Sequence, residues 1–158
     1  MEEEVEVAKQ LITGLLERIG AQARVEGFVK EGSLYLEIKS DQEGILIGRH
    51  GRTLDSLEIL INRMVNKRLI RAVRVVLDID DYRKRRADTL TKMALRLGEK
   101  PRGEVTPSRL AHPFNAQDRR LIHIALKENP SIRTESLGEG KLKKITIIPT
   151  RSNEERRN

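Results

Sequence analysis

One short loop combines glycine with positive charge. Gly48 and Gly51 enclose Arg49 and His50, and Arg52 follows directly. Glycine adopts backbone conformations closed to other residues and lets another chain approach closely. A helix expected from about residue 53 would point unpaired N–H groups and the positive end of its dipole at this loop. The pattern therefore predicts a site for phosphate groups, such as those of a nucleic-acid backbone.

An apolar run precedes this loop. Ile45 and Ile47 would border a groove for exposed bases beside the bound backbone. The same spacing of glycines also occurs in plain corners between two helices, so the loop alone leaves both interpretations open. His50 could titrate near neutral pH and donate to a phosphate. Alternatively, His50 has no specific role and is a polar residue tolerated at a variable position of the loop.

A second group of basic residues lies nearer the C-terminus. Arg119 and His123 are four residues apart, so a helix would present both on one face. Lys143 and Lys144 follow on an expected strand. Together they predict a cationic surface, rich in hydrogen-bond donors, that suits phosphates or base edges. Charged pairs at this spacing are also common on solvated helix faces, so the spacing alone does not distinguish a binding surface from an ordinary solvated one.

Three carboxylates are the strongest candidates for catalysis. Asp78, Asp80 and Asp81 lie at the end of an apolar strand, where they could hold Mg²⁺ for phosphoryl transfer. An acidic residue that caps the next helix is the alternative that we favour, above all for Asp81. The three histidines show no metal-ligand spacing, and the chain has no cysteine. We therefore expect a protein that is not an enzyme and that uses no cofactor or metal.

Charge is distributed unevenly along the chain. Residues 1–43 carry five basic and ten acidic residues, a net charge of −5, whereas residues 44–158 carry +12. This asymmetry favours a surface that binds a polyanion. Aromatic residues make up only 3% of the chain, so base stacking must be limited. No apolar run is long enough to span a membrane, and the acidic start does not resemble a signal peptide, so we expect a cytoplasmic protein.

Hydrophobic periodicity predicts the elements that position these groups. The first helix should bury the stripe of Val5, Ala8, Ile12, Leu15 and Ile19. The expected helices are 4–19, 53–68, 81–97 and one that runs from its N-cap at Asn115 to about Lys127. The expected strands are 22–29, 33–40, 73–79, 131–137 and 142–148. The third long helix opens with the basic run 83–86, for which a solvated face and a phosphate contact both stay open.

The fold class predicted from this order is α+β, with two small domains. Residues 1–80 form the first domain, residues 81–150 form a linking helix and the second domain, and residues 151–158 form a disordered polar tail. In the first domain, the segment from Ile47 to Leu54 stands after two strands and before a helix and a third strand. In that setting it resembles the KH domain in its type II order, helix-strand-strand-helix-helix-strand. The resemblance implies that the glycine loop clamps about four nucleotides of a single strand.

The second domain resembles the small single-strand nucleic-acid-binding domain named for its Arg-x-x-x-His motif. The match covers about residues 90–150. In that family the arginine and histidine lie on the binding surface, and they correspond to Arg119 and His123 here. Lys143 and Lys144 occupy strand positions where the family often has basic residues.

The two domains in this order are similar to the Jag proteins, also called KhpB or SpoIIIJ-associated proteins. The resemblance implies binding of single-stranded RNA or DNA, a KH-protein partner such as KhpA or a second copy, and a role in cell elongation, division or sporulation. Jag proteins commonly carry a further N-terminal domain, and both a short member and a trimmed chain fit a sequence that starts at the KH helix. Two other functions stay open: a protein-interaction module that docks through the acidic helix 1–19, and a nuclease that uses Asp78, Asp80 or Asp81.

Overall fold

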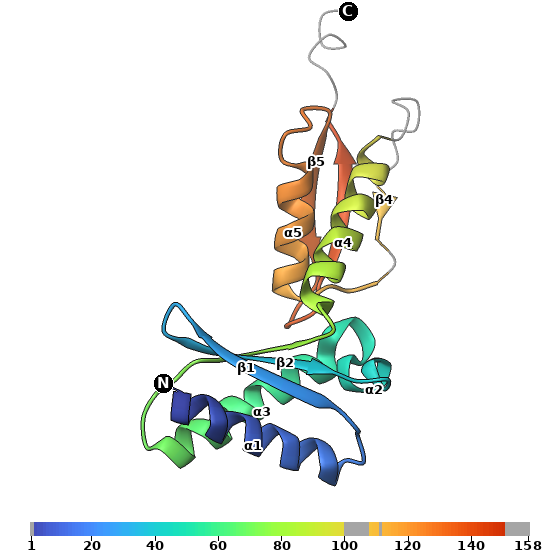
Figure 1. Ribbon diagram of the computed structural model, residues 1–158. Coiled ribbons are helices and arrows are strands. Elements are labelled where there is room, and N and C mark those ends of the chain that lie inside the picture. Colours follow the sequence, from blue (N-terminus) through green and yellow to red (C-terminus); the bar gives the residue numbers. More distant parts are fainter. Residues whose placement is uncertain (1, 100–107, 111, 151–158) are drawn as a thin grey trace, which may run out of the picture. The chain divides into compact units, whose positions relative to one another are not determined.

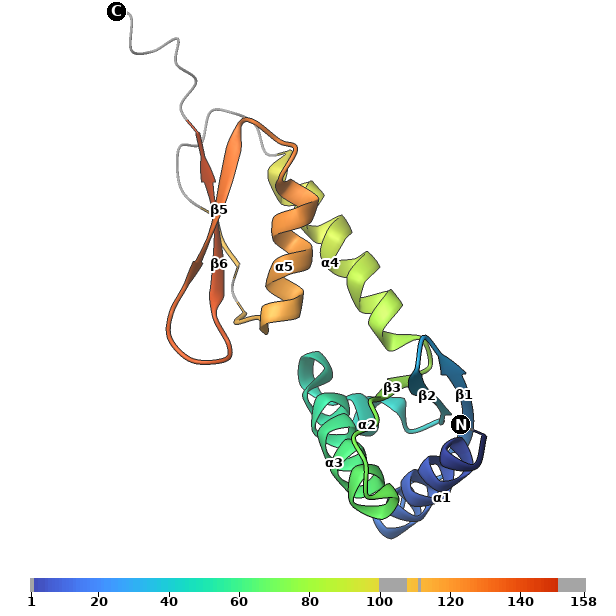
Figure 2. The ribbon, with the colours of Figure 1, turned by 90° about the vertical axis from the view of Figure 1, so that its left-hand side faces the viewer.

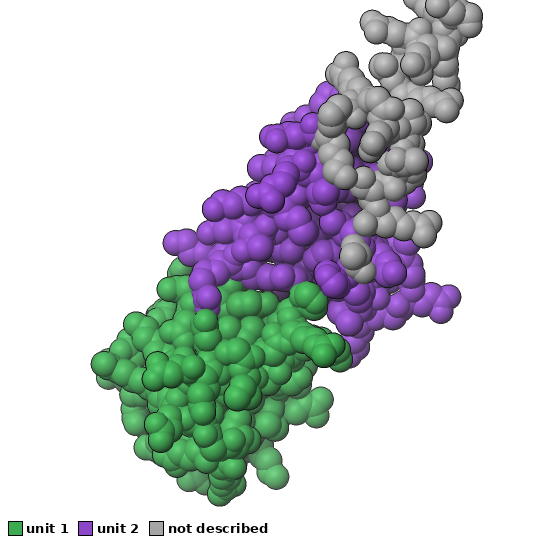
Figure 3. All heavy atoms as spheres, turned by 90° about the vertical axis from the view of Figure 1, so that its right-hand side faces the viewer, with its two compact units in different colours: residues 1–83 green, residues 84–158 purple. Residues whose placement is uncertain are grey.

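The chain divides into two compact units, Met1–Arg83 and Lys84–Asn158 (Figure 3). The computed structural model describes residues 2–99, 108–110 and 112–150. Each unit has its own hydrophobic core. The tail 151–158, expected to be disordered, lies outside the described residues. Among the helices that the structure describes, none is both long and apolar enough to cross a membrane.

The first unit is a three-stranded sheet with two long helices on one face (Figure 1). Its strands lie in the order β1-β2-β3, with β1 antiparallel and β3 parallel to β2. The helix-strand-strand-helix-helix-strand order confirms the fold class expected for this unit. The elements are α1 (Glu2–Arg18), β1 (Arg24–Lys30), β2 (Ser33–Lys39), α2 (Glu43–Ile47), the short 3-10 turn η1 (Arg49–Gly51), α3 (Arg52–Leu69) and β3 (Val75–Ile79).

The core of the first unit follows the sequence periodicity closely, with one exception. Alternation along β2 buries Leu34, Leu36 and Ile38, which face the two helices. On α1 the buried residues are Val5, Ala8, Ile12 and Leu16, and Leu15, which the sequence placed in the stripe, is half-buried against the same core. The prediction that Ile19 joins this stripe is wrong. The helix ends at Arg18, one residue earlier, and the Ile19 side chain is 54% exposed.

Side chains of α3 bind the outer edge of β3. Asn62 accepts a hydrogen bond from the N–H of Val75 (2.8 Å) and donates one to its carbonyl (2.7 Å). Glu58, one turn earlier, accepts from the N–H of Leu77 at 2.9 Å. A spacing of four residues places these two side chains on one face of the helix. The contacts fix α3 against the sheet, and with it the position of the helix N-terminus.

The second unit places two helices on one side of a small antiparallel sheet (Figure 2). Its strands lie in the order β4-β6-β5. The two-residue strand β4 is absent from the sequence predictions, because two residues are too few to show alternation. The elements are α4 (Tyr82–Gly98), which begins in the first unit, then β4 (Ser108–Arg109), α5 (Ala116–Leu126), β5 (Ile132–Leu137) and β6 (Lys144–Pro149).

Helix α5 is held at its N-terminus by a cap and by a buried ion pair. The Asn115 side chain accepts from the N–H of Asp118 at 2.8 Å, which confirms Asn115 as the N-cap. The Asp118 carboxylate lies 2.9 Å from the guanidinium of Arg86 on α4, and both side chains are mostly buried. Arg86 is therefore neither solvated nor a phosphate contact, the two roles considered for the basic run 83–86. Its partner is 32 residues away in sequence, beyond the reach of a local pattern.

Candidate nucleic-acid interface

The glycine loop adopts a backbone that suits glycine at both ends. Gly48 has φ = 71° and Gly51 has φ = 81°, and both values lie in the region that side chains disfavour. His50, between them, has φ = 55° and ψ = 28°. Histidine is one of the side chains that tolerates this left-handed conformation. The loop leads directly into Arg52, the first residue of α3, so the helix N-terminus opens at the loop.

Packing beneath the loop gives a second reason for glycine. A Cβ atom on Gly48 would overlap the Thr53 hydroxyl. A Cβ atom on Gly51 would lie 2.8 Å from a ring carbon of Tyr82, closer than real Cβ contacts come. Gly51 itself is buried. The shape of the loop is therefore set from below by Thr53 and Tyr82, and its outer side stays open to a ligand.

Exposed positive charge surrounds this opening. Arg49, His50 and Arg52 are all exposed, beside the N-terminal N–H groups of the 18-residue helix α3. Ile45, on α2, is 73% exposed and offers an apolar contact. The prediction that Ile47 also borders a groove is wrong. Ile47 is 8% exposed and belongs to the hydrophobic core, because the short helix α2 turns that side chain inward.

The carboxylates considered for metal binding connect structural elements instead. Asp78 accepts from the N–H of Arg83 at 3.3 Å and so caps α4, a role that the sequence suggested for Asp81. Asp80 accepts from the N–H of Ser40, also at 3.3 Å. Within residues 2–99, 108–110 and 112–150, no three acidic or histidine side chains lie close enough to hold a metal ion.

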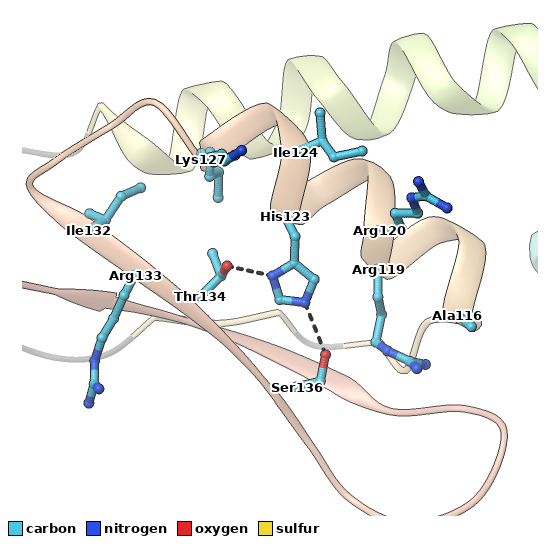
Figure 4. A pocket seen from close by; sticks show the side chains of 11 residues that line it. Ala116, Arg119, Arg120, His123, Ile124, Lys127, Ile132, Arg133, Thr134 and Ser136 are labelled. Carbon is cyan, nitrogen blue, oxygen red and sulfur yellow. Dashed lines mark hydrogen bonds between the residues drawn. The ribbon is translucent and has the colours of Figure 1, made fainter.

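Arg119 and His123 lie together on α5, and both are hydrogen bonded within the unit (Figure 4). The Arg119 guanidinium donates to the carbonyl of Phe114 at 2.8 Å, with a longer contact to that of Lys141 at 3.4 Å. The His123 ring points at β5, where Nδ1 meets the hydroxyl of Thr134 and Nε2 lies 3.2 Å from that of Ser136. The pair thus joins α5 to the β5–β6 hairpin, in addition to any contact with a ligand.

An open groove of about 620 Å³ lies between α5 and β5, and the sequence predictions named only part of its lining. Arg119 and His123 both line it. Arg120, Lys127 and Arg133, all exposed, also line it, and the sequence reasoning assigned none of them to a site. Arg120 and Lys127 add positive charge, whereas the Arg133 guanidinium pairs with Glu135 at 3.3 Å. The sequence did contain a pattern that could have assigned Arg120 and Lys127 to this groove. Arg120 and Lys127 follow Ala116 at helical spacings of four and eleven, which places them near His123 on α5.

Lys143 and Lys144 stand apart from this groove. Neither lines it. Lys144 pairs with Leu137, whereas Ser136 pairs with Ile145. Cross-strand partners share a face of the sheet and neighbours alternate, so Lys144 projects to the face opposite His123. Lys143 is half-buried and bridges to Phe114 through its backbone. The expectation of one surface made by Arg119, His123 and both lysines is therefore wrong for Lys144.

The charge of this surface comes from its arginines and lysine rather than from histidine. Burial lowers the pKa of His123 below the ordinary value of 6.5, and the positive charge of Arg119 lowers it further. A neutral imidazole at pH 7 contributes hydrogen bonds to Thr134 and Ser136 without adding charge. The sequence assigned a cationic role to this histidine because burial cannot be read from the motif.

The lowered pKa of His123 predicts a loss of stability in acid. Between the folded pKa and about 6.5, the unfolded chain binds more protons than the folded one. The contribution of neutral His123 to the free energy of unfolding is therefore fully present above about pH 6.5. It is lost as the pH falls through the pKa that His123 has in the folded protein. An NMR titration of the His123 Cε1 proton should give a midpoint below 6.5. Arg119→Gln should raise that midpoint, and a wild-type midpoint at or above 6.5 would contradict the assignment.

The sequence matches two known domain families in this order. Residues 6–79 match the KH domain of KhpA/KhpB, and residues 88–149 match the family of the Arg-x-x-x-His domain. A similar curated protein is RNA-binding protein KhpB of Clostridium symbiosum, 37% identical over 123 residues, which cover 78% of this chain and 55% of the relative. Another is RNA-binding protein KhpB of Lactiplantibacillus plantarum, 32% identical over 141 residues, which cover 86% of this chain and 42% of the relative.

A third relative is covered more fully. RNA-binding protein KhpB of Bacillus subtilis is 27% identical over 145 residues, 90% of this chain and 69% of the relative. The chain spans about half the length of the first two relatives. The shared part contains both the glycine loop and the Arg119–His123 helix.

Proposed function

Because the chain belongs to the KhpB (Jag) family, with a KhpA/KhpB-type KH domain followed by an Arg-x-x-x-His domain, we propose that it binds single-stranded RNA without catalysing a reaction. The observation that carries the proposal is the loop of residues 48–51. Its backbone requires glycine at both ends, and it opens at the N-terminus of α3 among exposed basic side chains. This arrangement suits the phosphates of an extended strand.

The groove between α5 and β5 supports a second contact on the same strand. Its exposed residues Arg120 and Lys127 suit phosphates, and the exposed side chain of Ile124 suits the apolar face of a base. In this proposal Arg119 and His123 hold the groove in shape through their bonds to the hairpin. Few aromatic residues are present, so we expect modest sequence specificity and a large electrostatic share of the affinity.

RNA is the proposed ligand because the curated relatives are named RNA-binding proteins. Single-stranded DNA is the competing ligand. We expect the protein to act in the cytoplasm, on transcripts linked to cell elongation, division or sporulation, as the family resemblance implies.

A binding measurement tests this proposal directly. Fluorescence anisotropy with labelled single-stranded RNA should give an association constant whose logarithm falls linearly with the logarithm of the salt concentration. Each phosphate contact should contribute about −0.7 to the slope of that line, so several contacts should give a steep slope. Lengthening the RNA from about 4 nucleotides, the reach of one KH loop, to about 12 should raise the affinity as the second unit engages. A matched RNA duplex should bind more weakly. No binding to RNA or DNA at moderate salt would refute the proposal.

Protein–protein interaction is a second candidate, favoured by one observation. Ile59 and Leu60, on the outer side of α3, are 59% and 42% exposed. Apolar side chains side by side on a helix surface suit a protein partner. We propose that the partner is another KH protein, either KhpA, which shares the matching domain family, or a second copy of this chain. Sedimentation velocity of the chain alone and with KhpA would separate these cases.

A further inference from the structure

Two carboxylates lie close to the phosphate site proposed for the first unit. Asp55 and Glu58 follow Arg52, the first residue of α3, by three and six positions. At 1.5 Å per residue these positions are about 5 and 9 Å along the helix axis. A bound phosphate would be repelled by both side chains, since the interaction between like charges is appreciable at this range near a protein surface. Something must offset them if the loop is to hold a polyanion.

Arg83 supplies the opposite charge. Its guanidinium lies 2.8 Å from the Glu58 carboxylate and 3.9 Å from that of Asp55. The Nε atom donates to the carbonyl of Leu77 at 3.2 Å, which anchors the side chain to the edge of β3. The Arg83 side chain is only 27% exposed, so its position is well determined by protein contacts rather than by solvent.

The backbone of Arg83 is fixed as firmly as its side chain. Its N–H donates to Asp78, the residue that caps α4. The preceding residue, Tyr82, packs its ring against Gly51 of the loop. The start of α4 thus lies against the glycine loop. Arg83 falls between the two matched segments, 6–79 and 88–149.

We propose that Arg83 is a positioning residue for the phosphate clamp, which neutralises Asp55 and Glu58 so that a nucleic-acid backbone can approach the N-terminus of α3. The proposal rests on the function proposed above. Arg83 does not touch the ligand in this mechanism. It raises the affinity by cancelling repulsion from the two carboxylates, and it holds Glu58 in place to accept the N–H of Leu77.

The expected effect is moderate and depends on salt. Removing one positive charge about 10 Å from a phosphate should weaken binding by about threefold to tenfold at low ionic strength. The effect should shrink as salt increases. Arg83→Gln should show this loss, and Arg83→Lys, which keeps the charge, should bind nearly as wild type.

A double variant separates compensation from direct contact. Glu58→Gln keeps an oxygen that can accept from Leu77 but removes the negative charge. In the variant Arg83→Gln/Glu58→Gln the affinity for single-stranded RNA should return to within about twofold of wild type, because one charge of each sign is lost. The dependence of that affinity on salt concentration should likewise return to that of wild type. Lys84→Gln is the matched control: it removes the same charge from the next residue, whose side chain is exposed, and it should change affinity less than Arg83→Gln.

The outcomes distinguish this inference from the function on which it rests. If wild type does not bind RNA, the proposed function fails. If wild type binds but Arg83→Gln binds equally well, the inference alone fails. A double variant that stays as weak as Arg83→Gln, with a salt slope reduced by about 0.7, would show a direct phosphate contact and overturn the positioning role. Amide NMR spectra of each variant would verify that the first unit stays folded.

Discussion

Replacing Arg49 and His50 with aspartate should lower the affinity for single-stranded RNA by about 100-fold at moderate salt, because it reverses the charge of Arg49 and adds a negative charge at residue 50 beside the bound phosphates. Both side chains are exposed at the N-terminus of α3, where a phosphate would meet the positive end of the helix dipole. The substitutions alter no buried group, and His50 already has a left-handed backbone that aspartate tolerates. Fluorescence anisotropy over a salt series would measure the loss, which should diminish as salt increases.

A charge reversal farther along α3 provides the control. Arg63→Asp/Lys67→Asp changes more charge than the loop variant, on exposed positions about 17 and 23 Å along the helix from its first residue. If the loop is the clamp, this control should lose far less affinity than the loop variant. Equal losses from both variants would mean that RNA responds only to the overall charge of the chain. A loop variant that binds within about threefold of wild type would exclude the loop as the main contact.

Asp118→Ala should destabilise the second unit by about 3–5 kcal/mol, because it leaves the mostly buried Arg86 guanidinium without its carboxylate. A unit of this size has a free energy of unfolding of about 4–10 kcal/mol, so most of its stability would be lost. The change also removes the link between α4 and α5. The first unit should stay folded, since neither residue belongs to it. Amide NMR spectra of the whole chain would therefore lose signals from residues 112–150 and keep those of residues 2–80.

Two further variants make this result specific. Asp88→Ala, at an exposed position on the same helix α4, should change stability by less than about 0.5 kcal/mol. The paired change Arg86→Met/Asp118→Leu, which replaces the ion pair by apolar side chains, should recover much of the loss. If Asp118→Ala unfolds within about 1 kcal/mol of wild type, the ion pair is not what holds the two helices together.

The local features of this protein follow from the sequence itself. The loop of residues 48–51, the strand alternation that buries Leu34, and the N-cap at Asn115 all depend on residues a few positions apart. Steric limits on φ, the period of a strand and the reach of a capping side chain act over the same short range. For that reason the order of elements and the glycine-dependent backbone of the loop could be predicted without coordinates.

Contacts between distant residues were decided by the tertiary structure alone. Arg83 and Arg86 belong to one basic run, yet they meet Glu58 and Asp118, 25 and 32 residues away. The motif containing His123 likewise says nothing of the burial that lowers its pKa. Each outcome depends on which elements pack together and how much water they exclude. A run of like charges, identical in local pattern, can therefore be an exposed surface at one residue and a buried ion pair two residues later.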